Sequence, residues 1–279
     1  MQDHAKTVVT YYDTHPINEH QILEKLALDG HSLDGLTEEV LQDYDQDHYG
    51  GLASTERLGS EAVIGAGHHV LDVCSGMGGP ARYFAFHRGC RVTGLDLTES
   101  RVIGARNLTS LVGLDHLVDY HHGDAQAMPF ENHAFDVAIS QEAWLHVPNK
   151  AAVVAECARV LRPGGMIAFT DLAEIESLDA ATMAKLSPAL ASVNFATMEQ
   201  YRQWLLATGF EIKIAFDRSE ELKTILTKRL AMYKQLGSQT RERFGMAREK
   251  EWEEGYSFFV EMVVTGKLGG CRFVAKKRP

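Results

Sequence analysis

Short apolar runs alternate with stretches of helical periodicity over most of the chain. Runs that predict strands cover residues 69–73, 91–95, 118–122, 135–140 and 166–170. Because helical segments separate them, the rhythm is typical of a parallel sheet with helices on both faces. A sixth strand is expected at residues 210–216 and a last one at 271–276. The pattern therefore predicts an α/β fold with a mostly parallel, seven-stranded sheet.

The regions outside this alternation have the spacing of helices. Apolar side chains recur on helix faces in the first 60 residues and again in residues 220–265. We interpret residues 1–60 as an N-terminal helical cap and residues 61–279 as the main domain. The helical insertion at about 220–265 is interpreted as a lid.

One helix boundary is marked clearly in the sequence. Thr197 can cap a helix with its hydroxyl while Gln200 reaches back to the backbone. The same helix is expected to end at Thr208, because Gly209 can adopt the left-handed conformation that closes a helix.

Composition narrows the functional classes. The 279 residues suffice for a full core, and their net charge of −10 repels phosphate, so no nucleic-acid partner is expected. Four scattered cysteines match neither a disulfide framework nor a zinc site, and no metal is predicted. Without a signal-peptide pattern or a membrane-spanning apolar run, the chain is expected to be cytoplasmic. The N-terminal helices carry an apolar stripe that can pack either on their own domain or on a second copy of the chain, so the sequence is compatible with a homo-oligomer.

A glycine-rich turn at residues 72–79 follows the first predicted strand. Ligands of open parallel sheets bind beyond the carboxyl ends of the strands. Glycines 76 and 78 allow a tight turn, and a side chain at either position would fill space that a ligand needs. The turn and Asp96, about 20 residues later, also satisfy the dinucleotide-binding fingerprint. By itself the turn does not identify the cofactor.

Two aspartates bear on this choice. Asp96 ends the second strand, where a carboxylate can accept both hydroxyls of a ribose in either kind of site. Asp124 follows the third strand and can accept the amino group of an adenine, which hydride-transferring enzymes of this fold do not need. No tyrosine precedes a lysine by four residues, a pairing that dehydrogenases often carry. These features favour a methyltransferase over a dehydrogenase.

Five segments carry a resemblance to a known family. They are residues 70–79, 94–97, 123–125, 135–140 and 161–165. Over roughly residues 45 to 276 the chain resembles the class I S-adenosylmethionine-dependent methyltransferases. The resemblance implies a Rossmann-like fold and S-adenosylmethionine as the cofactor. Cys74 departs from the family pattern, which usually has glycine there.

A narrower similarity concerns the acceptor. Residues 50–53, 140–146 and 258–270 look like segments of the sarcosine and dimethylglycine methyltransferases and the phosphoethanolamine methyltransferases. This similarity implies methylation of a small molecule, with an amine nitrogen as the favoured acceptor. The residues that the resemblance assigns to the cofactor are Tyr12, Gly76, Met77, Gly78, Asp96, Leu97, Asp124, Ala125 and Gln141.

The catalytic assignment centres on His146. A histidine can take a proton from an amine at physiological pH. In the phosphoethanolamine family the matching histidine works with a tyrosine from the N-terminal segment. The possible partners here are Tyr11, Tyr12, Tyr44 and Tyr49, of which Tyr49 is assigned to catalysis.

Two further residues are assigned to the acceptor pocket. Trp144 follows the fourth strand and can hold a cationic amine by cation–π attraction. Glu142 can attract the same positive charge. Three other functions stay open: carbon or hydroxyl methylation of a larger natural product, cofactor binding without catalysis, and, more remotely, a dehydrogenase.

Overall fold

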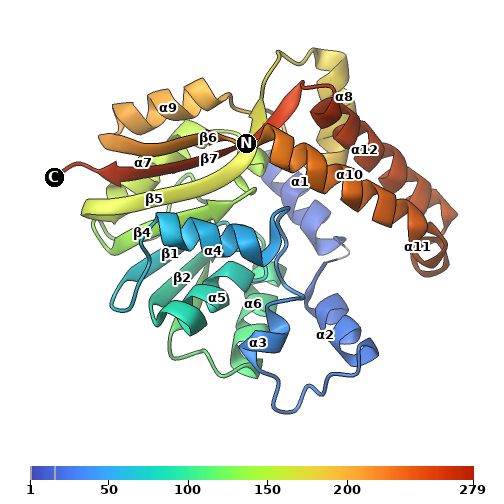
Figure 1. Ribbon diagram of the computed structural model, residues 1–279, viewed down its shortest axis with the longest axis horizontal. Helices are drawn as coiled ribbons and strands as arrows, with labels where there is room; N and C mark the ends of the chain where they lie inside the picture. Colours follow the sequence, from blue (N-terminus) through green and yellow to red (C-terminus); the bar gives the residue numbers. More distant parts are fainter. Residues whose placement is uncertain (1, 16) are drawn as a thin grey trace.

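A computed structural model describes residues 2–15 and 17–279, in which seven strands form a single sheet (Figure 1). The strand order is β3-β2-β1-β4-β5-β7-β6. Strands β1 to β5 run parallel, and β7 lies antiparallel between β5 and β6. The strands are β1 (His69–Val73), β2 (Arg91–Asp96), β3 (Val118–His122), β4 (Phe135–Gln141), β5 (Leu161–Glu174), β6 (Phe210–Asp217) and β7 (Leu268–Lys277). The predicted mostly parallel, seven-stranded α/β fold is confirmed.

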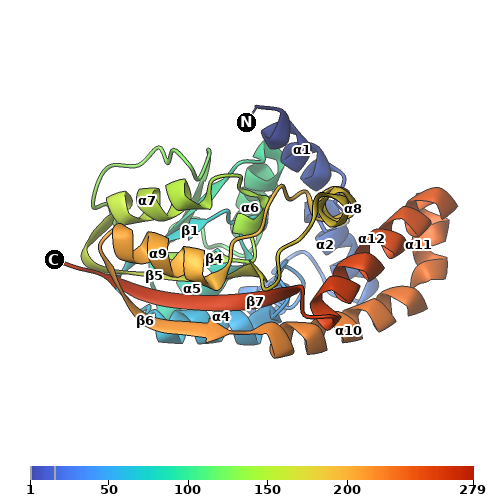
Figure 2. The same cartoon turned by 90° about the horizontal axis from the view of Figure 1, so that it is seen from above.

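Helices cover both faces of this sheet. The first set comprises α4 (Gly51–Glu61), α5 (Gly79–Arg88) and α6 (Glu99–Leu111), and the second α7 (Lys150–Val160) and α9 (Met198–Ala207). Val70 of β1 packs with the first set, whereas its neighbour Leu71 packs with the second. Successive side chains of one strand thus point into two different cores. Helices α4 and α5 lie on the opposite side of the sheet from α7 and α9 (Figure 2).

Four helices gather beside the sheet: α8 (Ala180–Leu190), α10 (Ser219–Gln235), α11 (Gly237–Phe244) and α12 (Met246–Val264) (Figure 1). Leu186, Leu226 and Phe259, from α8, α10 and α12, share one apolar cluster. The region predicted as a helical insertion is therefore helical and packs as a unit with α8.

The N-terminal segment supplies α1 (Gln2–Asp13), α2 (Glu19–Leu28) and α3 (Glu38–Leu41). Leu26 and Leu41 pack on Leu108 of α6 and on Met77 of the glycine turn. This packing joins the N-terminal helices to the carboxyl ends of the strands.

Local predictions can be compared directly with these elements. Thr197 and Gln200 form a reciprocal capping box, and Gly209 has a φ of 88°, as predicted. Strand β7 begins at Leu268, three residues before its predicted start. Gly269 and Gly270 disfavour a strand in the sequence pattern, but their pairing with β5 holds them in the ladder.

Candidate active site

A cavity of about 270 Å³ lies beyond the carboxyl ends of β1, β2 and β4. The strand order turns at β1 and β4, the place where open α/β sheets bind ligands. His4, Val8 and Tyr12 of α1 line the cavity from the side opposite the sheet. The remaining lining comes mainly from the loops that follow the strands.

The glycine turn forms part of the cavity wall. Gly76 has a φ of 53°, and a Cβ there would meet nothing within 4 Å, so this residue leaves open space. Gly78 has a φ of 78°, but its Cβ would lie 2.1 Å from the hydroxyl oxygen of Tyr120. The ligand-space explanation for glycine at 78 is therefore wrong, because Tyr120 occupies that space. Met77 lines the cavity and Gly78 does not.

Cys74 occupies a strained position in the same turn. Its φ is 64°, in the left-handed region that favours glycine. This conformation gives a physical reason for the glycine that the family usually has there. The Cys74 side chain also lines the cavity.

Asp96 connects the end of β2 to the glycine turn. Its carboxylate accepts hydrogen bonds from the backbone N–H of Gly76, at 2.9 Å, and of Thr98, at 2.8 Å. Burial raises its pKa, although these two N–H groups oppose the shift. Leu97, the next residue, lines the cavity beside it.

The loop after β3 supplies Asp124 and Ala125 to the cavity. Asp124 is exposed, and one of its carboxylate oxygens accepts the backbone N–H of Gln126 at 2.8 Å. Ala125 is buried. The structure thus brings these two residues together with Gly76, Asp96 and the rest of the predicted cofactor set, except Gly78.

Several buried polar atoms on lining residues lack a hydrogen-bond partner among the described residues, including a carboxylate oxygen of Asp72, the Ser75 hydroxyl and the amide oxygen of Gln141. Burial raises the pKa of Asp72 to about 7, and the nearby Asp96 adds to the shift. Buried polar groups normally have partners, so these atoms are suited to a polar ligand. Asp72 and Ser75 were not predicted individually, although both lie within the turn.

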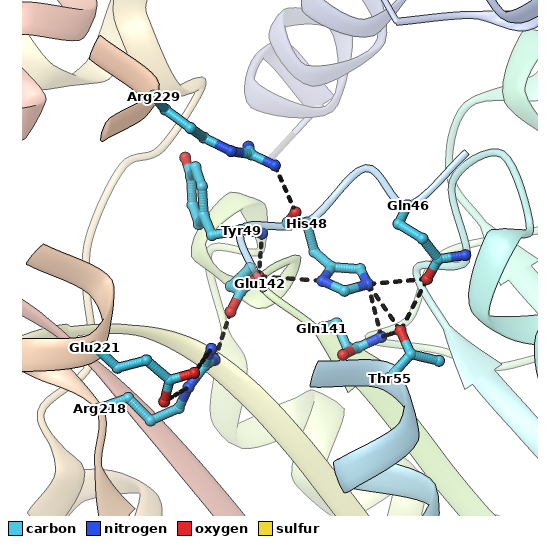
Figure 3. A network of polar contacts seen from close by, with 9 residues as sticks. All are labelled: Gln46, His48, Tyr49, Thr55, Gln141, Glu142, Arg218, Glu221 and Arg229. Carbon is cyan, nitrogen blue, oxygen red and sulfur yellow. Dashed lines mark hydrogen bonds and ion pairs between the residues drawn. The ribbon is translucent and has the colours of Figure 1, made fainter. Parts of the chain in front are cut away.

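Gln141 belongs to a polar network at the end of β4 (Figure 3). Its side-chain nitrogen donates to the Thr55 hydroxyl, at 3.0 Å, and lies 3.1 Å from Nε2 of His48. Burial lowers the pKa of His48, because it disfavours the charged form of the ring. The network fixes the Gln141 amide in the cavity wall.

Glu142 lines the cavity, but its charge is already compensated. Arg218 donates to one carboxylate oxygen at 2.6 Å, and the Tyr49 N–H donates to the other at 2.8 Å. The predicted attraction of a cationic amine by Glu142 is correspondingly weakened. Arg218 itself was not predicted, since it lies 76 positions from Glu142.

His146 and Tyr12 meet at the cavity. The Tyr12 hydroxyl lies 2.7 Å from Nε2 of His146, while Nδ1 lies 3.3 Å from the Ala191 carbonyl oxygen. Because a carbonyl only accepts, Nδ1 carries the proton and Nε2 accepts from Tyr12. Burial lowers the pKa of His146 to about 4.

Two predicted residues lie elsewhere. The Tyr49 ring packs 6.0 Å from the Phe259 ring, centroid to centroid, and does not line the cavity, so Tyr12 is the tyrosine that meets His146. Trp144 is 1% exposed, and its ring centroid lies 4.3 Å from that of Phe169. The prediction that Trp144 forms a wall of this pocket is wrong, because the short helix Trp144–His146 directs it into the core.

Two absences concern the part of the chain that the structure describes. No helix there is both long enough and apolar enough to cross a membrane. Within the same residues, no group of three histidine, cysteine or acidic side chains is arranged to hold a metal ion.

Comparisons with known proteins bear on this cavity. Residues 71–169 match the family model described as a methyltransferase domain. A sarcosine/dimethylglycine N-methyltransferase of Halorhodospira halochloris is 33% identical over 165 residues, covering 59% of each chain. A 27-O-demethylrifamycin SV methyltransferase of Amycolatopsis mediterranei is 29% identical over 190 residues, covering 66% of this chain and 69% of that enzyme.

A solved structure shares the fold. Phosphoethanolamine N-methyltransferase 2 of Haemonchus contortus, in complex with phosphomonomethylethanolamine and S-adenosylhomocysteine, has a TM-score of 0.76 at 20% identity. The likeness covers 96% of this chain and 59% of that one. The chain spans between 30% and 59% of the length of four curated relatives that it matches.

Proposed function

Because this chain belongs to the class I S-adenosylmethionine-dependent methyltransferases, we propose that it methylates a small molecule, with an amine nitrogen as the acceptor. The observation that carries the proposal is the convergence of the glycine turn, Asp96 and Gln141 on one cavity beneath α1. Similarity to the enzyme from Halorhodospira halochloris supports the choice of an amine.

The cavity fits the cofactor of this family. Gly76 leaves open space, and Asp72, Ser75 and Gln141 present buried polar atoms without partners among the described residues. When bound, S-adenosylmethionine supplies a methyl group on a positively charged sulfur. The residues that would hold it are Tyr12, Gly76, Met77, Asp96, Leu97, Asp124, Ala125 and Gln141. Gly78 would not contact the cofactor, but its lack of a side chain lets the turn pack against Tyr120.

The Tyr12–His146 pair would close the cavity over the acceptor. A pKa of about 4 makes His146 neutral at physiological pH and a weak base. An in-line displacement depends mainly on alignment and on exclusion of water, and a dedicated base is optional. We therefore assign the pair to positioning and closure. Gln141, whose amide oxygen has no partner among the described residues, is suited to accept an N–H of the amine.

An acceptor panel tests this proposal. The protein is incubated with methyl-labelled cofactor and with glycine, sarcosine, dimethylglycine or phosphoethanolamine, and products are identified by mass spectrometry. We expect labelled amine products from at least one acceptor and none from an Asp96→Ala variant. Transfer to hydroxyl or carbon acceptors alone would overturn the choice of nitrogen. Cofactor binding without transfer to any acceptor pool would favour a non-catalytic binding protein.

A second candidate function is methylation of a hydroxyl or carbon on a larger natural product. The similarity to the rifamycin methyltransferase supports it. An apolar cluster of α8, α10 and α12, containing Leu145 and bordered by Tyr49, also lies close to the cavity wall at Glu142. An apolar acceptor would suit this side of the cavity. A panel of hydroxylated polyketides and terpenoids separates the two candidates.

The compartment is part of the same proposal. All four cysteines are free, and three of them are buried. Free cysteines suit a reducing compartment, which we take to be the cytoplasm. The net charge of −10 argues against a nucleic-acid acceptor.

A further inference from the structure

Arg218 is a buried arginine at the start of α10 that reaches the cavity wall. Its side chain is 2% exposed, and its Nη1 lies 2.6 Å from a carboxylate oxygen of Glu142, whose side chain is 3% exposed. Glu221, a more exposed residue on the first turn of α10, contacts the same guanidinium at 3.3 Å (Figure 3). The arginine therefore links the helices beside the sheet to the residue that follows β4.

Glu142 stands in a backbone conformation that needs support. Its φ is 48°, the left-handed region that residues with a Cβ rarely adopt. Its N–H donates to the Thr170 carbonyl oxygen at 2.7 Å, and its second carboxylate oxygen accepts the Tyr49 N–H. Arg218 provides the remaining contact. Without it, the strained residue would lose its only charged hydrogen bond among those described.

Two glycine segments from the sequence analysis make room for Arg218. A Cβ on Gly50 would lie 3.3 Å from an Arg218 guanidinium nitrogen and would also clash with Ser54. A Cβ on Gly270 would lie 3.4 Å from the Cβ of Arg218. Both glycines belong to segments shared with amine methyltransferases, and neither lines the cavity. Packing explains glycine at position 50, mainly through Ser54, whereas at Gly270 the contact with Arg218 is of ordinary van der Waals length.

The charges of the pair are balanced. Burial, the largest single effect, pushes the pKa of Glu142 upward, but Arg218, His48 and the Tyr49 N–H together outweigh it and leave the pKa below its usual range. His48 faces the second oxygen with its Nδ1 at 3.9 Å, and burial lowers the pKa of its ring. Arg218 is thus the side chain that holds the ionised Glu142 in place.

We propose that Arg218 is a positioning residue for the reaction: by fixing Glu142 it sets the backbone that carries Gln141, so the wall of the cavity is complete only when the start of α10 is docked. The kinetic part of this inference rests on the proposed methyl transfer. The docking itself is independent of that function.

Matched substitutions separate positioning from stability. Arg218→Met removes the charge, Arg218→Lys retains it, and Arg218→Met combined with Glu142→Gln leaves no buried charge uncompensated. Arg272→Met is the control, because Arg272 is a buried arginine paired with Glu61 at 2.8 Å that does not line the cavity.

We expect Arg218→Met to lower kcat about 10- to 100-fold, while the KM for the cofactor changes less than about threefold. The double variant should regain unfolding stability but keep the low kcat. Arg218→Lys should have a kcat between those of Arg218→Met and the wild type. Arg272→Met should lose stability with kcat unchanged. A double variant or an Arg218→Met protein with wild-type kcat would overturn the proposal.

Amide hydrogen exchange provides the test that does not depend on activity. The Tyr49 N–H, which donates to Glu142, should exchange faster in Arg218→Met and in Glu142→Gln than in the wild type, but not in Arg272→Met. Unchanged protection at Tyr49 would overturn the inference. Faster exchange in a protein that transfers no methyl group would refute the proposed function alone.

Discussion

The Tyr12 hydroxyl of α1 lies 2.7 Å from Nε2 of His146, 134 positions later in the chain. Three other contacts hold the same helix: His4 bonds to the His146 carbonyl oxygen at 2.8 Å, the Tyr11 hydroxyl donates to the Ala189 carbonyl oxygen, and Arg101 lies over the Tyr12 ring. Since Tyr12 and His146 also line the cavity, this contact holds α1 against the residues that form the candidate site.

Replacing Tyr12 by phenylalanine should weaken the docking of α1 over the cavity. The variant loses one buried hydrogen bond, worth about 1 kcal/mol of stability. We expect kcat/KM to fall about tenfold or more, because water enters and alignment is lost. Tyr11→Phe is the matched control, since its hydroxyl bonds to a carbonyl and does not line the cavity. Equal kinetic losses in the two variants would contradict a specific role for Tyr12.

Replacing Cys74 by glycine should remove backbone strain. The left-handed conformation costs a residue with a Cβ roughly 1–2 kcal/mol, whereas glycine carries an entropic cost of about 0.5–1 kcal/mol. We expect the urea midpoint to stay equal or rise slightly and the affinity for S-adenosylhomocysteine to increase about two- to fivefold. Cys74→Val, with a branched Cβ, should be less stable than the wild type. A glycine variant destabilised by more than about 1 kcal/mol would argue against strain at this position.

Asp96→Ala should abolish tight cofactor binding. The carboxylate orders the Gly76 and Thr98 N–H groups, and hydrogen bonds to charged groups contribute about 1.5–3 kcal/mol each. We expect the Kd for S-adenosylhomocysteine, measured by calorimetry, to rise about 100-fold. Asp119→Ala serves as the control, because Asp119 is exposed and lies outside the cavity. An Asp96 variant that binds normally would remove Asp96 from the cofactor site.

The sheet and the cofactor turn were predictable because they depend on local patterns. Strand β1, at residues 69–73, has its predicted bounds, since an apolar run ending at a glycine turn has few alternative structures. The capping box at Thr197 is equally local. The family assignment followed from such segments, and residues 71–169 match a methyltransferase domain.

Contacts between distant segments were not predictable. Of the four N-terminal tyrosines, the sequence analysis assigned Tyr49 to catalysis, whereas the docking of α1 places Tyr12 against His146. Trp144 has the position expected of a pocket wall, but one short helical turn rotates it against Phe169. No local signal pairs Glu142 with Arg218. These outcomes depend on tertiary packing, which hydrophobic periodicity does not specify.

The pKa of His146 predicts a loss of stability in mild acid. Its folded-state pKa is about 4, against an ordinary value near 6.5, because burial disfavours the charged ring. Between these pH values the unfolded chain binds a proton that the folded protein does not. The contribution of this group is therefore fully present above about pH 6.5 and declines as the pH falls to about 4. The total loss should be roughly 3 kcal/mol.

His146→Gln isolates this effect, since glutamine keeps hydrogen-bonding capacity without titrating in this range. Asp72, whose pKa is raised to about 7, changes stability in the opposite direction, because its folded form keeps a proton that the unfolded chain loses above about pH 4. That contribution is present in both proteins and cancels in their difference. Urea unfolding at pH 7, 5.5 and 4.5 should show the wild type losing its advantage over His146→Gln as the pH falls. Parallel stability curves would mean that His146 titrates normally and that burial does not disfavour its charged ring.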